Sequence, residues 1–137
     1  MGSKPVTVET TKQLSALRQI QAAIAHMHKK EFECAITLAG AAEGQLPEST
    51  KEYMFRLLKK VMPGEDHNAF INWMKHSTGP DKATISELEV VVAIARAIHK
   101  FVAVYEASCK EFEEFSAWAV ANGHMPKPLT EDARPGG

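Results

Sequence analysis

Apolar residues recur every three or four positions along most of the chain, which is the period of an α-helix. One stripe consists of Leu17, Ile20, Ile24 and Met27, and another of Tyr53, Met54, Leu57, Leu58 and Val61. Between these stripes, one helix side would carry Phe32, Ala35, Ile36, Ala39, Ala42 and Leu46, and we expect that helix to end before Pro47. The pattern therefore predicts three amphipathic helices in the first half of the chain.

The second half contains the most apolar stretch, residues 88–106, whose sequence is "LEVVVAIARAIHKFVAVYE". A helix that is apolar nearly all round is surrounded by other elements, so this segment is predicted to be the central helix. After Ser108, a shorter final helix is indicated by Phe112, Phe115, Trp118 and Ala119. Gly123 is well placed to follow the C-cap of that helix.

No alternation of period two exceeds a few residues, and no hairpin dipeptide lies between β-branched runs. The expected fold class is all-α, an up-and-down bundle of four longer helices plus one or two short helices. A chain of 137 residues that is 45% apolar can form one compact domain with a real core. We place this domain at residues 10–123 and expect flexible tails at 1–9 and 124–137.

Four helix starts are indicated by a Ser or Thr followed three positions later by Glu or Gln. The pairs are Thr10/Gln13, Ser49/Glu52, Ser86/Glu89 and Ser108/Glu111. In such a capping box, the two side chains bind backbone N–H groups that have no partner within the helix. Each pair precedes an apolar pattern of helical period, so each is predicted to begin a helix.

The composition excludes several classes of protein. A net charge of −1 provides no strong field for attracting polyanions, so nucleic-acid binding would need a local basic patch. Cys34 and Cys109 form no C-x-x-C motif, which argues against a disulfide framework or a zinc knuckle. No apolar run approaches the roughly 18 residues that a membrane span needs. We expect a reduced, cytoplasmic protein with no membrane association.

Sites for common cofactors and metals are not indicated either. The phosphate-binding loop, the dinucleotide fingerprint and the H-E-x-x-H zinc motif are all missing from the sequence. Di-iron bundles use Glu-x-x-His pairs, and no Glu here is followed by His at that spacing. His26 and His28, with Glu31 nearby, come nearest to a ligand set, but side chains two positions apart on a helix diverge. We expect no metal and no cofactor.

Two charged residues lie within apolar helices, Glu43 among alanines and Arg96 in the central helix. A carboxylate buried without a partner would cost several kcal/mol. Two explanations remain open: Glu43 and Arg96 form a structural ion pair, or they face a functional cleft.

The segment "FINWMKH" places Asn72 and His76 four residues apart, on one face of a helix, with Lys75 beside them. A histidine with a pKa near neutrality can act as a general acid or base. Lys and His near a helix C-terminus also interact favourably with the helix dipole. Spacing alone therefore leaves both a catalytic and a structural role open.

Taken together, "FECAITLAGAAEGQL" and "FINWMKH" resemble bacterial proteins of the HEPN superfamily (higher eukaryotes and prokaryotes nucleotide-binding domain), over roughly residues 14–123. The resemblance implies a helical bundle that dimerises and, in active members, cleaves RNA without metal through an Arg-(polar)-x-x-x-His motif. His76 matches the motif histidine and Asn72 the polar residue, but Ile71 occupies the arginine position. Glu43 matches a carboxylate common in the second helix of the superfamily.

Without the motif arginine, charge on the phosphate would lack its stabilising guanidinium. We therefore expect a cytoplasmic homodimer that binds a partner protein or RNA and has no efficient ribonuclease activity, with Lys75, Glu43 and Arg96 as candidate binding residues. Two alternatives remain: a weak metal-independent ribonuclease that uses His76, and a structural or assembly subunit.

Overall fold

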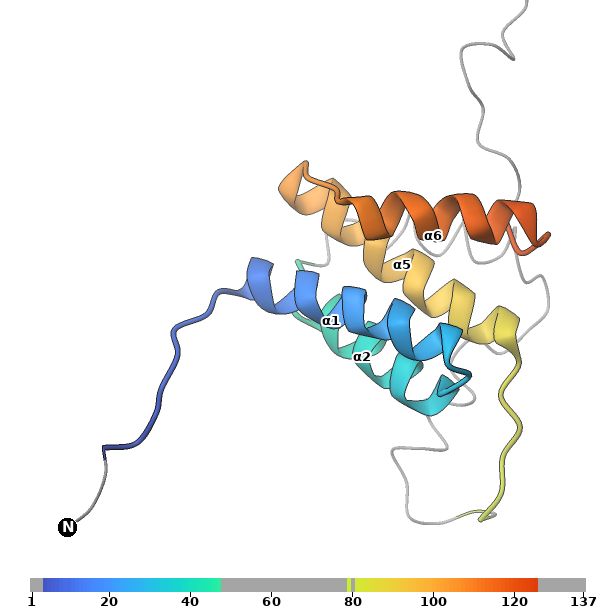
Figure 1. Cartoon of the computed structure of the whole chain (residues 1–137), viewed down its shortest axis with the longest axis horizontal. Coiled ribbons are helices and arrows are strands. Elements are labelled where there is room, and N and C mark those ends of the chain that lie inside the picture. Colours follow the sequence, from blue (N-terminus) through green and yellow to red (C-terminus); the bar gives the residue numbers. More distant parts are fainter. Residues whose placement is uncertain (1–3, 48–78, 80, 126–137) are drawn as a thin grey trace, which may run out of the picture.

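The structure, a computed structural model, describes residues 4–47, 79 and 81–125. This part of the chain is all-α and contains no strand, which confirms the predicted fold class. Its four helices pack against one another (Figure 1): α1 (Lys12–His28), α2 (Phe32–Gly44), α5 (Glu87–Tyr105) and α6 (Lys110–Ala121). The predicted stripe at residues 53–61 and its capping pair, Ser49/Glu52, lie outside the described residues.

Helices α1 and α2 form an antiparallel hairpin with a connection of three residues. Lys30 in this connection has a left-handed backbone with φ 64. Its N–H donates to the Met27 carbonyl at 2.9 Å, and the Glu31 N–H donates to the His26 carbonyl at 2.9 Å. This is the Schellman pattern that ends many helices. At the other end of the hairpin, the Gln45 amide donates to the Gln19 side chain at 2.6 Å.

Helix α5, which was predicted to be the central helix, contacts α1, α2 and α6, and α1 likewise contacts each of the other three described helices. The apolar pattern of α5 is wide enough to serve all three neighbours, since the buried residues extend around much of its circumference. The core that it shares with the other helices includes the buried residues Ile20, Ala35, Ala39, Val91, Ile94, Phe101, Phe112 and Phe115. The small residues of α2 allow that helix to lie close to α1 and α5.

The predicted capping boxes have different outcomes. The Ser86/Glu89 box is confirmed: the Glu89 N–H donates to the Ser86 hydroxyl at 3.1 Å, and the Ser86 N–H donates to the Glu89 carboxylate at 2.8 Å. The Thr10/Gln13 prediction is wrong by one residue, because Thr11 is the N-cap and accepts from the Leu14 N–H at 3.0 Å.

The Ser108/Glu111 box is also wrong, because Cys109 is the N-cap of α6 and makes no side-chain cap hydrogen bond. This register places Glu111 at the second helical position instead of the third. There, a hydrogen bond from its own backbone N–H lowers the pKa of Glu111. A carboxylate in the first turn also interacts favourably with the helix dipole.

Helix α6 ends as predicted, with Gly123 in a left-handed conformation at φ 75. The Gly123 N–H donates to the Val120 carbonyl at 3.1 Å, and the His124 N–H donates to the Ala119 carbonyl at 2.9 Å. Met125 then packs against the core. The packed part of the chain therefore continues two residues beyond the expected boundary at 123.

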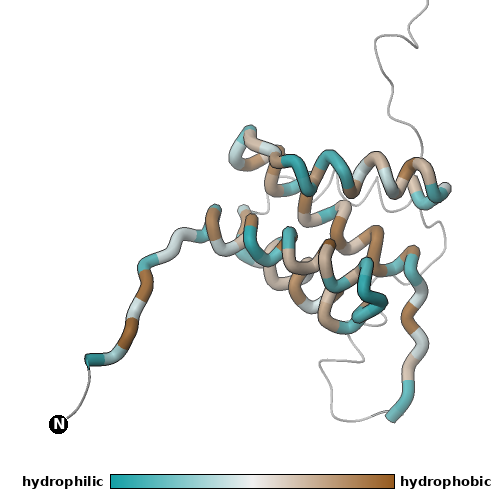
Figure 2. The backbone as a smooth tube through the Cα atoms, viewed as in Figure 1, coloured by the Kyte–Doolittle hydropathy of each residue, from teal (hydrophilic) through white to brown (hydrophobic). Residues whose placement is uncertain are grey.

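Residues 4–10, which we call the arm, precede α1 and run away from the helices (Figure 1). The arm contains two valines, Val6 and Val8, whose exposed fractions are 96% and 84%. Figure 2 shows that the apolar segments of the arm lie away from the helices. The arm thus carries apolar surface that the described part of the same chain does not cover.

Candidate functional site

Of the residues proposed for function, the structure describes Glu43 and Arg96 and brings them together. The Arg96 Nη2 atom lies 2.8 Å from the Glu43 Oε1 atom, with side chains 21% and 20% exposed. The ion pair links the last turn of α2 to the middle of α5. Asn72, Lys75 and His76 lie outside the described residues, as does Ile71, so their roles remain predictions.

A third polar residue belongs to this cluster and was not proposed from the sequence. The Lys100 ammonium donates to the Glu43 carbonyl at 3.1 Å, and Lys100 is only 6% exposed. The last carbonyls of a helix lack partners within it and carry its negative dipole end, so Lys100 caps the C-terminus of α2. The sequence feature that could have identified Lys100 is its spacing, because Lys100 follows Arg96 by four residues and therefore lies on the same face of α5.

The arrangement of Glu43, Arg96 and Lys100 is that of a structural clamp between two helices. The carboxylate of Glu43 neutralises Arg96, and its carbonyl engages Lys100. The Arg96 Nε atom is buried and makes no hydrogen bond. The ion pair considered for Glu43 and Arg96 is therefore present, and a role of these two residues in binding stays a prediction.

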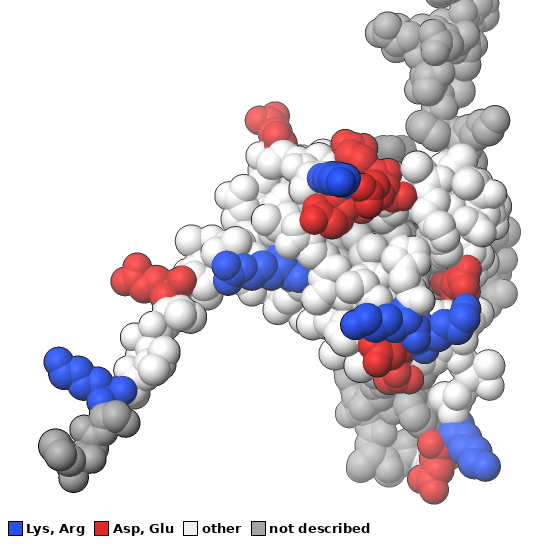
Figure 3. All heavy atoms as spheres, viewed as in Figure 1, with Lys and Arg blue, Asp and Glu red and all other residues white. Residues whose placement is uncertain are grey.

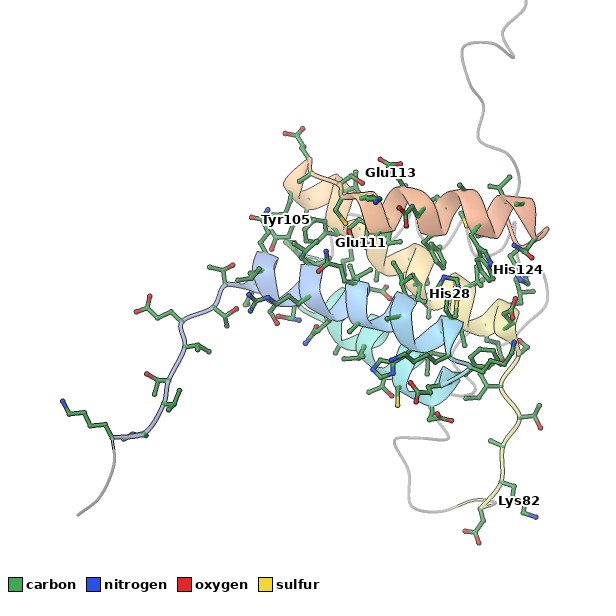
Figure 4. All side chains as sticks on the ribbon, in the orientation of Figure 1. His28, Lys82, Tyr105, Glu111, Glu113 and His124 are labelled. Carbon is green, nitrogen blue, oxygen red and sulfur yellow. The ribbon has the colours of Figure 1, made fainter. Side chains whose placement is uncertain are left out.

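A second cluster joins the start of α5 to the ends of α1 and α6. His124 lies with its Nε2 atom 2.6 Å from the Glu87 Oε1 atom. The Trp118 ring contacts two histidine rings. The distance between ring centroids is 5.1 Å to His28 and 5.5 Å to His124. In Figure 4, His28 and His124 approach the same end of α6 from different elements. These contacts attach the last residues of the bundle to its body.

The two histidines of α1 have different partners. His26 pairs with Glu31 at 2.7 Å, whereas His28 packs edge-on against Trp118. In the described ranges, no three His, Cys, Asp or Glu side chains converge as a metal site requires. The side chains of His26 and His28 themselves diverge, as expected for residues two positions apart on a helix.

The two cysteines are free and differ in their surroundings. Cys34 is exposed on α2, whereas Cys109 is half-buried, with its sulfur 4.0 Å from the Gln21 amide nitrogen. Burial raises the pKa of the Cys109 thiol. A catalytic cysteine needs the opposite shift, since the thiolate is the nucleophile. Cys109 therefore does not have the setting of an activated nucleophile.

Among the described residues, side chains of α5 and α6 line a groove of about 400 Å³. Its apolar lining comprises Ala95, Ile98, Val102, Ala103, Phe112 and Met125. Its polar lining comprises His99, Ser108, Glu113 and Ser116. Burial lowers the pKa of His99, so its ring is neutral near pH 7. This groove could not be predicted from the sequence, because it depends on the angle between two helices.

Comparison with protein-family profiles, with curated proteins and with solved structures found no match to this chain. Among the helices that the structure describes, none combines the length and apolar content needed to cross a bilayer. The functional assignment accordingly rests on the residues and contacts described above.

Proposed function

We propose that this chain is a HEPN-like helical bundle that forms a homodimer and binds a protein partner, without efficient ribonuclease activity. The observation that carries the proposal is the ion pair of Arg96 with Glu43 at 2.8 Å. Because Ile71 occupies the position of the motif arginine, another cation would have to stabilise charge on the phosphate. Recruiting Arg96 for that role would leave the Glu43 carboxylate, only 20% exposed, without its partner.

A protein partner is favoured over RNA by the distribution of charge and apolar surface. Arg96 and Lys100 are both engaged by Glu43 of α2, Arg96 through the carboxylate and Lys100 through the backbone carbonyl. Figure 3 shows acidic side chains gathered on α6, where Glu111, Glu113 and Glu114 are exposed, and no continuous basic track on that face. The groove between α5 and α6 is lined mainly by apolar side chains, which suits a protein segment.

The ribonuclease question is tested with an RNA cleavage assay in EDTA. We expect the wild type to cleave at background level and His76→Ala to change the rate by less than a few fold, because Ile71 supplies no charge to the transition state. Ile71→Arg should raise the rate. Clear wild-type cleavage that is abolished by His76→Ala would contradict the proposal and favour the weak ribonuclease.

Binding to RNA is tested separately by titrating a single-stranded RNA at 50 and 200 mM salt. We expect weak binding that disappears at the higher salt, because contacts to phosphates alone are strongly salt-dependent. Tight binding that persists at 200 mM salt would favour an RNA-binding module over a protein-binding one.

The homodimer is tested by sedimentation at micromolar concentration. The expected mass is twice the chain mass of 15.1 kDa. A single species at the chain mass over the whole concentration range would refute the dimer.

A further inference from the structure

The arm and the groove are two apolar surfaces that lie apart on the same chain. Val6 and Val8 are 96% and 84% exposed, the largest values among the exposed large hydrophobic residues of the described chain. The groove is lined by residues of α5, of the α5–α6 connection and of α6, together with Met125, and by none of α1 or the arm. In Figure 1 the arm leaves the start of α1 in a direction away from α5 and α6.

The sequence of the arm, "KPVTVET", favours an extended backbone. Pro5 fixes its own φ and restricts Lys4 before it to extended conformations. Val6, Thr7 and Val8 are β-branched and prefer extended structure. In an extended chain, residues two positions apart point to the same side and lie roughly 6.5–7 Å apart. Val6 and Val8 therefore form one apolar edge, with Thr7 on the opposite side.

The groove has the features that such an edge needs. Its exposed apolar surface comes from Val102, which is 36% exposed, and from Ala103, whereas Ile98 and Phe112 in the same lining are already buried. The hydroxyls of Ser108 and Ser116 lie in its lining, and hydroxyls can bind the backbone groups of an extended segment. Glu113, which is exposed at the groove, is complementary in charge to Lys4, two residues before Val6. Figure 4 shows Glu113 on the outer side of α6.

We propose that the arm of one copy of this chain docks into the α5–α6 groove of a second copy, with Val6 and Val8 against Val102 and Ala103 and with Lys4 near Glu113. The exchange is reciprocal, so that two arms and two grooves are related by a two-fold axis. The inference rests on the proposed homodimer and specifies how its copies recognise each other.

The first test compares the dimer dissociation constants of full-length variants by sedimentation. Val6→Asp/Val8→Asp and Val102→Asp are each expected to weaken the dimer at least tenfold. Thr7→Asp, on the opposite side of the arm, is the matched control and should change the constant less than twofold. Circular dichroism checks that each variant remains helical. A dimer that is insensitive to both the arm and the groove substitutions would overturn arm exchange and leave the homodimer standing.

The second test is disulfide trapping in a Cys34→Ser background, where a chain with Val8→Cys is mixed with a chain with Ala103→Cys. We expect a disulfide-linked heterodimer, identified by its mass. Pairing Val8→Cys with Glu33→Cys, which is exposed on α2, is the control and should give little product. Equal yields in the two mixtures would overturn the proposal. So would a monomeric product from a chain carrying both Val8→Cys and Ala103→Cys, because the arm would then occupy its own groove.

Discussion

At the scale of the residue, the described part of the chain has two non-glycine residues with positive φ, Lys30 at 64° and Glu106 at 51°. The left-handed conformation costs an L-residue roughly 1–2 kcal/mol, whereas glycine adopts it freely. Lys30 adopts it because the Schellman hydrogen bonds at the end of α1 require it. Gly123 has the equivalent place after α6, without the strain.

Lys30→Gly is therefore expected to stabilise the protein by about 1 kcal/mol. The matched control is Lys29→Gly, because Lys29 has φ −88 and gains nothing from glycine. Urea unfolding of the two variants and the wild type measures the difference. A loss of stability in Lys30→Gly equal to that in Lys29→Gly would contradict the assignment of strain to Lys30.

His99 predicts a pH dependence of stability. Burial lowers the pKa of its ring in the folded protein, so the unfolded chain takes up the proton first as the pH falls. This contribution to stability is complete above the ordinary pKa of 6.5 and is lost as the pH falls below it. His99→Gln should consequently show a smaller fall in Tm between pH 7.5 and pH 5.5 than the wild type. An equal fall in both proteins would contradict the prediction.

At the scale of the element, the start of α1 depends on one hydroxyl. Thr11 accepts the Leu14 N–H at 3.0 Å, so Thr11→Ala should destabilise the protein by about 1 kcal/mol. Thr10→Ala is the control, because the Thr10 hydroxyl makes only a 3.5 Å contact with the Thr11 carbonyl. Its expected cost is within about 0.5 kcal/mol. The thermal unfolding of both variants distinguishes them, and a larger effect at Thr10 would reverse the assignment.

The clamp between α2 and α5 gives a second prediction at this scale. A double-mutant cycle with Glu43→Gln and Arg96→Met should give a coupling energy of about 1–3 kcal/mol, because both side chains are largely shielded from water. The control is Lys110 with Glu114, which are 85% and 63% exposed at 3.5 Å. Exposed pairs contribute roughly a few tenths of a kcal/mol. Equal coupling in the two cycles, measured by urea unfolding, would show that Glu43 and Arg96 are not a structural pair.

The helices themselves could be predicted from the sequence because their apolar periods are long and regular. Of the stripe predicted for α1, Ile20, Ile24 and Met27 are buried and Leu17 is partly buried, and α2 ends before Pro47. The N-caps were harder to predict, because adjacent threonines at 10 and 11 satisfy the same preference. A shift of one residue also moved Glu111 from the third to the second position of α6. Periodicity averages over many side chains, whereas a cap depends on one.

At the scale of the whole molecule, the contact between Glu43 and Arg96 could be anticipated because each was a charge in an apolar helix. Lys100 was missed because a long side chain can bury its stem and reach a carbonyl on another helix. The groove could not be predicted at all, since it depends on how α6 crosses α5. The sequence therefore indicates which polar residues need partners, but the packing angles determine which surfaces stay open.

The proposed homodimer makes the last prediction, a Tm that depends on protein concentration. When a folded dimer unfolds to two separate chains, mass action stabilises it by about 2.7 kcal/mol for each hundredfold rise in concentration. For a dimer of two 137-residue chains, this stabilisation corresponds to a rise in Tm of about 5 °C. Scanning calorimetry between 1 and 100 μM measures it. The Val6→Asp/Val8→Asp variant should lose most of this dependence and Thr7→Asp should keep it. A constant Tm in the wild type would contradict a dimer whose stability is coupled to folding.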